Sequence, residues 1–367
     1  MDEKETIAWL RLSRTERVGS ATFRRLLNQW GSARAALEAL PDMVRRGGGG
    51  KPLAILSLPE AQRIMAATEH MSGAVVCLPD AAYPPVLRSA EDAPPVLFAA
   101  GPLRLERRYV VGVVGARNAS LNGQKFTRML AEELAQHKVV VASGLAAGID
   151  TAAHHGALAG GTVAVLGCGL DRFYPAENKK LQEKIMAEGL LLSEYPPGTA
   201  PAARHFPQRN RIIAGMSHAV AVVEASLQSG SLNTARLAGE YGREVFAVPG
   251  SPLDPRSQGT NKLIREGGHL LESAADILPV LPRLDTPQLF EQRPTLPYLD
   301  AIKMPDDATL RAAQASVLTA LSATAVTLDE LHQAVRLPPG LVQLVLLELE
   351  LAGRIERTPG GTIARLF

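Results

Sequence analysis

Short, wholly apolar runs alternate with stretches of helical periodicity between residues 109 and 248. The runs are Val110–Val114, Val139–Val141, Val163–Leu166, Leu190–Leu192, Ala219–Val223 and Val245–Val248. Valine-rich strands that are apolar on both faces are typical of a buried parallel sheet. Their alternation with helices gives right-handed βαβ crossovers. We therefore predict that residues 74–281 form an α/β domain with a doubly wound, Rossmann-like parallel sheet.

The residues before 109 do not show this alternation of apolar runs and helical stretches. Residues 1–73 carry apolar positions at helical spacing, with a break at Val18–Ser20. Two helices joined by a short glycine turn fit a helix-hairpin-helix (SAM-like) domain, and they fit a small helical bundle equally. The next segment contains prolines at 84–85 and 94–95, for which we predict extended chain without a helix.

The C-terminal part separates from the α/β domain at a proline-rich stretch. Residues 282–305 contain five prolines and little periodicity, which predicts a linker. Residues 306–367 hold three helical runs and two short strand-like runs around Pro-Gly-Gly. The helical runs are Thr309–Leu321, Leu328–Val335 and Gly340–Ala352, and the strand-like runs are Arg354–Arg357 and Thr362–Arg365. Thr327 and Glu330 have capping-box spacing. Three helices and a hairpin predict a winged-helix domain.

Composition limits the function only weakly. The net charge of +2 does not by itself indicate a nucleic-acid partner, and 4% aromatic residues argue against a base-stacking platform of the OB-fold kind. No apolar run is long enough to span a membrane, and the acidic start differs from a secretory signal. Cys77 and Cys168 lie in apolar runs, where buried, reduced thiols are expected. These features predict a cytoplasmic protein without a membrane partner.

Glycine- and serine-rich loops follow the predicted strands. The loops are Gly115–Asn118, Ser143–Gly148, Gly167–Gly169 with Asn178–Lys180 beyond it, Glu194–Gly198, Glu224–Ser231 and Pro249–Ser251. The carboxyl ends of parallel strands meet at one sheet edge, where glycine exposes backbone and helix N-termini offer unpaired N–H groups. Ser143, Ser229 and Ser231 are candidates either to cap helices or to donate to phosphate. The loops together predict an anion site.

The segment from Phe206 to Arg211 is the most specific part of this edge. Arg209 and Arg211 flank Asn210, just before a helix expected to begin at Ile212. Arginine can donate two parallel hydrogen bonds to phosphate, although structural ion pairing is the alternative for both side chains. Phe206 is either an exposed ring for base stacking, which we favour, or a core residue.

Motifs of several enzyme classes are missing. The first strand is not followed by G-x-G-x-x-G, and the sequence contains no Walker motif, no G-x-S-x-G elbow and no metal-ligand spacing. Asp150 and Glu224 are the carboxylates expected near the site, and we predict that Asp150 is the N-cap of a helix over Thr151–Leu158. The residues therefore predict phosphate binding without a cofactor, a metal or a catalytic residue.

Four long motifs resemble the bacterial DNA-processing protein A family (DprA, also called Smf). They are Gly115–Arg117, Ser143–Asp150, Phe206–Gly215 and Ser229–Leu232. The resemblance implies a non-catalytic protein that binds single-stranded DNA, protects incoming strands in natural transformation and loads the RecA recombinase. It also implies a homodimer formed through the α/β domain. The DNA-binding residues that it implies are Arg117, Ser143, Gly144, Gly148, Lys179, Phe206, Arg209, Asn210 and Arg211. Many relatives carry a basic residue three places before the phenylalanine, where Ala203 stands here, and the adjacent Arg204 is the candidate substitute.

Two other functions compete with this one. The glycine and serine loops could hold a nucleotide, as in nucleoside-monophosphate phosphoribohydrolases, which need a P-G-G-x-G-T loop closely followed by a catalytic glutamate. Here the corresponding stretch is residues 229–234, and the next glutamate is Glu240. A winged-helix transcription regulator would need a basic recognition helix, whereas Gly340–Ala352 is rich in leucine and glutamate.

Overall fold

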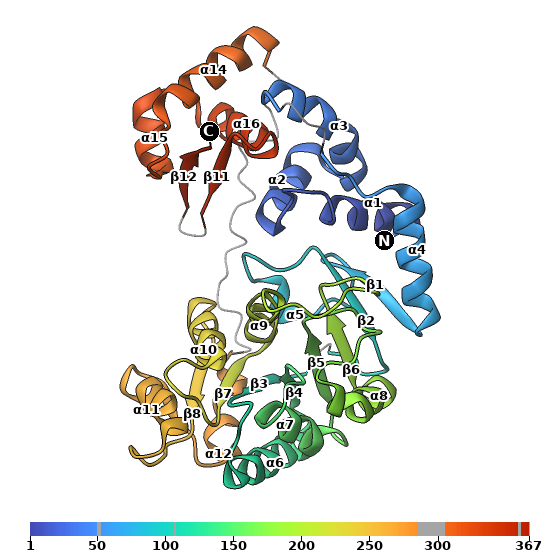
Figure 1. The fold of residues 1–367 in the computed structure, drawn as a ribbon, viewed down its shortest axis with the longest axis vertical. Helices are drawn as coiled ribbons and strands as arrows, with labels where there is room; N and C mark the ends of the chain where they lie inside the picture. Colours follow the sequence, from blue (N-terminus) through green and yellow to red (C-terminus); the bar gives the residue numbers. More distant parts are fainter. Residues whose placement is uncertain (50–52, 106–107, 285–304, 359–360, 367) are drawn as a thin grey trace. The chain divides into compact units, whose positions relative to one another are not determined.

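The computed structural model describes residues 1–49, 53–105, 108–284, 305–358 and 361–366 (Figure 1). They form two compact units. One comprises Met1–Ala61 with Leu289–Phe367, and the other Gln62–Gln288. In the described chain, no helix is both long and apolar enough to cross a membrane.

The second unit is built on a nine-stranded sheet with the order β1-β2-β6-β5-β4-β3-β7-β8-β9. Its strands are β1 (Gly73–Cys77), β2 (Val96–Ala100), β3 (Val110–Val114), β4 (Val140–Ser143), β5 (Thr162–Leu166), β6 (Leu190–Ser193), β7 (Ala219–Val222), β8 (Glu244–Ala247) and β9 (His269–Leu270). β2 pairs antiparallel with β1 and β6, and the other pairs are parallel. The predicted doubly wound, mostly parallel sheet is confirmed.

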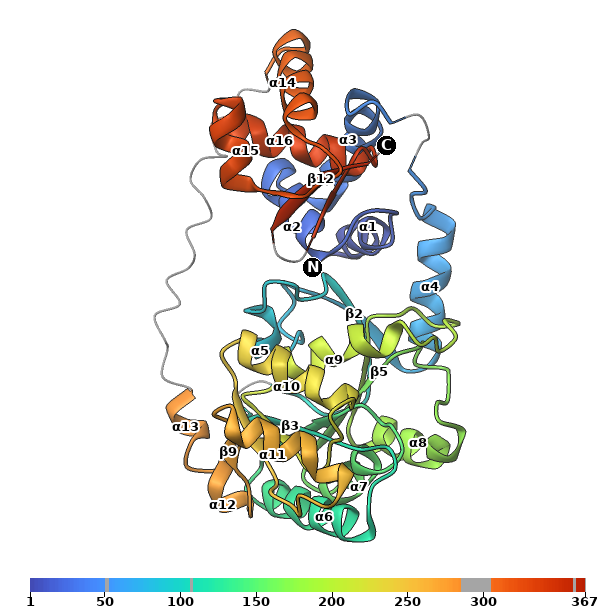
Figure 2. The same cartoon turned by 60° about the vertical axis from the view of Figure 1, so that its left-hand side comes forward.

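Helices cover both faces of this sheet. They are α5 (Pro85–Arg88), α6 (Leu121–Gln136), α7 (Ile149–Ala157), α8 (Lys179–Glu188), α9 (His205–Met216), α10 (Gly230–Glu240), α11 (Gln258–Arg265), α12 (Ala274–Ile277) and α13 (Leu281–Leu284), with 3-10 turns at Ala176–Asn178 and Pro255–Ser257. Side chains alternate across β3, so Val110 and Val114 pack with α9 and α10, whereas Val111 and Val113 pack with α6 and α7. In Figure 2, α9 and α10 lie side by side over the sheet.

Two local predictions were wrong in this unit. The proline-rich segment contains the one-turn helix α5, because Pro85 stands at its first position, where the missing N–H costs nothing. The segment from Phe206 to Arg211 is not a loop before a helix. It lies within α9, which begins at His205. Pro207 is tolerated there because it lies in the first turn.

The other unit holds the N-terminal helices and the winged helix. Its elements are α1 (Glu3–Ser13), α2 (Ser20–Trp30), α3 (Ala33–Arg46), α14 (Asp307–Ala320), α15 (Leu328–Val335), α16 (Pro339–Leu351), β10 (Val326–Thr327), β11 (Ile355–Arg357) and β12 (Thr362–Arg365), and α4 (Leu58–His70) runs across the boundary between the units. The predicted three helices, hairpin and capping box are confirmed. Of the predicted linker, residues 285–304 lie outside the described residues, and Pro282 belongs to α13.

The third winged-helix helix, α16, packs on α3 within this unit. The Glu348 carboxylate is fully buried and lies 2.7 Å from Nη2 of Arg46. Glu350 accepts a hydrogen bond from Arg25 at 2.9 Å. These two acidic residues of α16 are thus bound by arginines of the N-terminal helices.

Candidate nucleic-acid interface

A cavity of about 620 Å³ opens at the carboxyl edge of the sheet. The chain leaves β3 toward β4 on one side, and later enters β7 on the other side of β3, so the strand order reverses here. A reversal of this kind leaves a crevice between the diverging loops, which is where α/β sheets bind ligands. The lining residues are Val114, Gly115, Arg117, Ala146, Asp150, Tyr174, Pro201–Ala203, Phe206, Pro207, Arg209, Asn210, Ile213, Ser229–Ser231 and Thr234. A second cavity of about 200 Å³ shares Arg117, Phe206 and Arg209 with it.

Helix α9 presents one face to the cavity. Phe206, Asn210 and Ile213 recur at spacings of four and three residues, and all three line it together with Arg209. Arg209 and Arg211 are two residues apart, so they diverge by about 200° around the helix. Only Arg209 can therefore lie on the cavity side.

Arg209 forms the charged floor of the cavity. Its side chain is buried, with 4% of the residue exposed, and Nη1 donates to the carbonyl oxygen of Val165 at 3.0 Å. Its Nε has no hydrogen-bond partner among the described residues. Burial lowers the pKa of this guanidinium, and the charge of Asp150 opposes that effect. A buried cation on a residue that lines a cavity is suited to an anionic ligand.

Asp150 organises the loop beside Arg209, and its predicted role was wrong. The N-cap of α7 is Gly148, and Asp150 lies inside the helix. Its Oδ2 accepts hydrogen bonds from the backbone N–H groups of Gly144 at 3.1 Å and Ala146 at 3.3 Å. Burial raises the pKa of this carboxyl, while Arg209 counteracts the shift. The carboxylate thus fixes the loop and partly balances the Arg209 charge.

Asn178 holds the same loop from the other side. Its Nδ2 donates to the Leu145 carbonyl oxygen at 2.9 Å and to Oγ1 of Thr151 at 2.8 Å. Gly148 has φ +79°, and an added Cβ would collide with the backbone of Ala116 and Arg117. Sequence reasoning did not find the role of Asn178, because a single asparagine carries no pattern that indicates a loop anchor.

The three predicted serines differ in their surroundings. Ser143 is fully buried and its Oγ donates to the Val113 carbonyl oxygen at 2.6 Å, so the hydroxyl is not presented to the cavity. Ser229 and Ser231 line the cavity and their hydroxyls lie 2.7 Å apart at the start of α10. Asn210 donates to the Gly230 carbonyl oxygen at 3.4 Å. Ser229 is also the N-cap of α10, so it both caps this helix and lines the cavity.

An exposed rim surrounds the cavity. Arg117 is exposed, and its Cζ lies 5.3 Å from the centroid of the Phe206 ring. The centroid of the Tyr174 ring lies 5.3 Å from that of the Phe206 ring, and the two ring planes form an angle of 31°. Phe206 is half-buried rather than a core residue. Sequence reasoning missed Tyr174, since only the fold brings it to Phe206.

The remaining predicted basic residues lie outside both cavity linings. Arg204 is exposed at the N-terminus of α9. Nζ of Lys179 lies 4.9 Å from the centroid of the Phe173 ring and 3.9 Å from a carboxylate oxygen of Glu183. The structure therefore places them around the site rather than in it.

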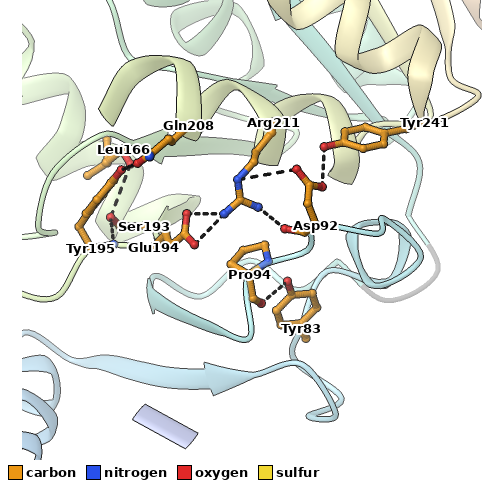
Figure 3. A network of polar contacts seen from close by, with 10 residues as sticks. All are labelled: Tyr83, Asp92, Pro94, Leu166, Ser193, Glu194, Tyr195, Gln208, Arg211 and Tyr241. Atoms are coloured by element: carbon orange, nitrogen blue, oxygen red, sulfur yellow. Dashed lines mark hydrogen bonds and ion pairs between the residues drawn. The ribbon is translucent and has the colours of Figure 1, made fainter. Parts of the chain in front are cut away.

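Arg211 is bound by carboxylates, as Figure 3 shows. Its Nη2 donates to both oxygens of Glu194, at 2.7 and 2.6 Å, and Nη1 donates to the Asp92 carbonyl oxygen. Asp92 also accepts from the Tyr241 hydroxyl at 2.6 Å. Burial acts to lower the pKa of Arg211, but Glu194 and Asp92 raise it overall. Structural ion pairing was the alternative to phosphate binding for both arginines. Arg211 forms such an ion pair, with Glu194.

Two groups with nucleophilic or basic character near the cavities are protonated or already hydrogen-bonded. Burial raises the pKa of Cys168 to about 11, so this buried free thiol stays protonated at neutral pH. Glu224 accepts from the hydroxyl of Ser120 at 2.5 Å and from its N–H at 2.9 Å. Among the described residues, no group of three or more His, Cys, Asp or Glu side chains could hold a metal ion.

Comparison with known proteins gives consistent matches along the chain. The family model "DNA recombination-mediator protein A" matches residues 74–282, a DprA-like N-terminal HHH domain matches 3–67, and a DprA winged helix domain matches 302–361. The HHH match favours the first of the two N-terminal alternatives.

Similar proteins come from several bacteria. DNA processing protein DprA of Streptococcus pneumoniae is 50% identical over 201 residues, covering 54% of this chain and 71% of the relative. A putative DNA processing protein DprA of Mycobacterium tuberculosis is 37% identical over 374 residues, covering 96% and 92%. The solved S. pneumoniae structure has a TM-score of 0.64 at 39% identity, covering 77% and 99%. A Helicobacter pylori DNA processing protein A structure, described for its single-stranded DNA binding mode, has a TM-score of 0.52 at 32% identity, covering 58% and 97%.

Proposed function

The chain belongs to the DNA recombination-mediator protein A family, and from this premise we propose that it binds single-stranded DNA without catalysing a reaction. The strand's phosphates bind in the cavity at the carboxyl edge of the sheet. The bound protein acts as a recombination mediator.

The observation that carries the proposal is Arg209. Its buried guanidinium belongs to a residue that lines the cavity and has had its hydration removed during folding, so an anion that enters regains charge-assisted hydrogen bonds for it. Arg117 stands at the rim as an exposed second cation. The loop over Ser143–Gly148 adds polar backbone groups to the cavity lining, and the start of α10 adds the positive end of a helix dipole.

The single-stranded form of the ligand is supported by the rim aromatics and by the H. pylori relative's described binding mode. RecA loading, protection of incoming strands in natural transformation and a homodimer through the α/β domain come with the family resemblance. A cytoplasmic location follows from the sequence features, and all of these are part of the same proposal.

The test is fluorescence anisotropy with a labelled oligothymidylate and the full chain. Arg117→Ala should weaken binding by about tenfold or more, because a hydrogen bond to a charged group contributes about 1.5–3 kcal/mol. It should also lower the slope of log affinity against log salt by about 0.7, the value for one phosphate contact on a single strand.

Arg128→Ala is the matched control. Arg128 is another exposed arginine, on α6 at the opposite face of the sheet. Wild-type protein that binds no single-stranded DNA, or Arg117→Ala with unchanged affinity and salt slope, would contradict the proposed interface.

An enzyme acting on nucleotides is the alternative that the cavity itself suggests, because Asp150 borders it with a raised pKa. That carboxylate already accepts two backbone hydrogen bonds, which leaves it a structural role. Incubation with nucleoside monophosphates and chromatography for released base separates the two functions. Turnover that Asp150→Asn abolishes would overturn the non-catalytic proposal.

A further inference from the structure

We propose that Tyr174 is a base-stacking residue of this interface and that it gives the site its preference for single strands. The inference rests on the proposed binding of single-stranded DNA. Tyr174 follows β5, and it belongs to none of the motifs from which the DNA site was predicted.

Tyr174 presents the more open of two neighbouring rings. It is 42% exposed and lines both cavities, whereas Phe206 is half-buried. Phe206 contacts the Tyr174 ring at 5.3 Å and the Arg117 guanidinium at 5.3 Å, so two neighbours already cover part of it. With the ring centroids this close, a base cannot enter between them and must stack on the free surface. Phe206 thus supports the ring on which stacking occurs.

The segment that carries Tyr174 is anchored on both sides. Nε2 of Gln182 donates to the carbonyl oxygens of Leu170 and Arg172, each at 3.1 Å. After Tyr174, the buried Asn178 is tied to the loop beside Arg209. A ring held in place before binding loses little conformational entropy when a base stacks on it.

The placement matches the chemistry of a single strand. A phosphate at Arg209 or Arg117 leaves its neighbouring base beside the rim, where Tyr174 offers an apolar face. Every base has such a face, so stacking tolerates any sequence. In a duplex the base faces are covered by neighbouring pairs, so Tyr174 gains nothing from duplex DNA.

Binding of the full chain to two labelled ligands tests this directly. One is an oligothymidylate, and the other has the same length and phosphates but only abasic sugars. Tyr174→Ala should weaken oligothymidylate binding by a factor of about 5 to 150, the range for loss of one base–aromatic stack. It should leave binding of the abasic strand and of duplex DNA unchanged. Tyr174→Phe should keep the wild-type affinities.

Phe173→Ala is the control, because Phe173 is the adjacent aromatic with a similar 41% exposure but lines neither cavity. It should keep the wild-type ratio of the two affinities. If wild type binds neither ligand, the proposed function fails. If wild type binds and Tyr174→Ala retains its oligothymidylate affinity, only this inference fails. Equal loss for both ligands would assign Tyr174 a structural role and overturn base stacking.

Discussion

Replacing Arg209 with methionine removes the positive charge that offsets the buried Asp150 carboxylate. Asp150 and Arg209 are 6% and 4% exposed, and methionine keeps much of the arginine's apolar volume. Arg209 and Asp150 interact through their charges without a direct ion pair. The cost of removing Arg209 therefore stays below the roughly 3–5 kcal/mol that loss of one partner of a direct buried ion pair brings. In a domain of this size each kcal/mol lowers Tm by about 2–4 °C. We therefore expect Arg209→Met to lower the Tm of the α/β unit by several degrees, and by less than about 20 °C, at neutral pH.

The same change should make stability depend on pH in a defined direction. Burial already raises the folded-state pKa of Asp150, and losing Arg209 raises it further. A carboxyl whose pKa is higher in the folded than in the unfolded state binds its proton more tightly when folded. Stability is therefore lost as pH rises from the unfolded pKa through the folded pKa. The Tm deficit of Arg209→Met should be small in mild acid and grow toward neutral pH.

Differential scanning calorimetry of the full chain at both pH values measures this effect. Arg128→Met controls for loss of an exposed arginine, and Asp150→Asn added to Arg209→Met should restore much of the Tm at neutral pH. An Arg209→Met protein that melts like wild type would refute charge compensation. A deficit that is equal at both pH values would refute the assignment to Asp150.

Three further predictions separate binding from folding. Gly144→Ala should weaken oligothymidylate binding about tenfold with the fold retained, because the new methyl would overlap the Arg209 guanidinium and displace it. Anisotropy measures the binding and circular dichroism checks the fold. Wild-type affinity in this variant would show that DNA binding does not use the Arg209 guanidinium. Arg211→Met should lower the Tm, because it removes the hydrogen bonds that Arg211 donates to Glu194 and Asp92, yet it should keep the affinity for single strands. An affinity loss like that of Arg117→Ala would put Arg211 in the interface. Thr327→Ala should lower the free energy of unfolding of the winged-helix domain by about 1 kcal/mol, because it removes the N-cap of α15. Calorimetry should show a lower transition temperature, with DNA binding unchanged. An unchanged transition temperature would contradict the capping role.

The sequence by itself determined most of the elements and the edge of the sheet at which the candidate site lies. Continuous valine-rich runs report burial on two faces, which requires a parallel sheet, and parallel strands bring their following loops to one edge. The winged helix followed likewise from helical spacing, a capping box and a hairpin around Pro-Gly-Gly. These features depend on local periodicity and chain connectivity, which a sequence records directly.

The tertiary structure decided which side chains face the cavity. The start of α9 at His205 sets the helical phase, and that phase turns Arg209 inward and Arg211 toward Glu194. Tyr174 reaches Phe206, and Asp150 reaches Gly144, only after separate strands align. Contacts of this kind depend on where an element begins and what packs against it. The residue types in the sequence are the same whether an arginine binds phosphate or a carboxylate, so only the folded chain distinguishes them.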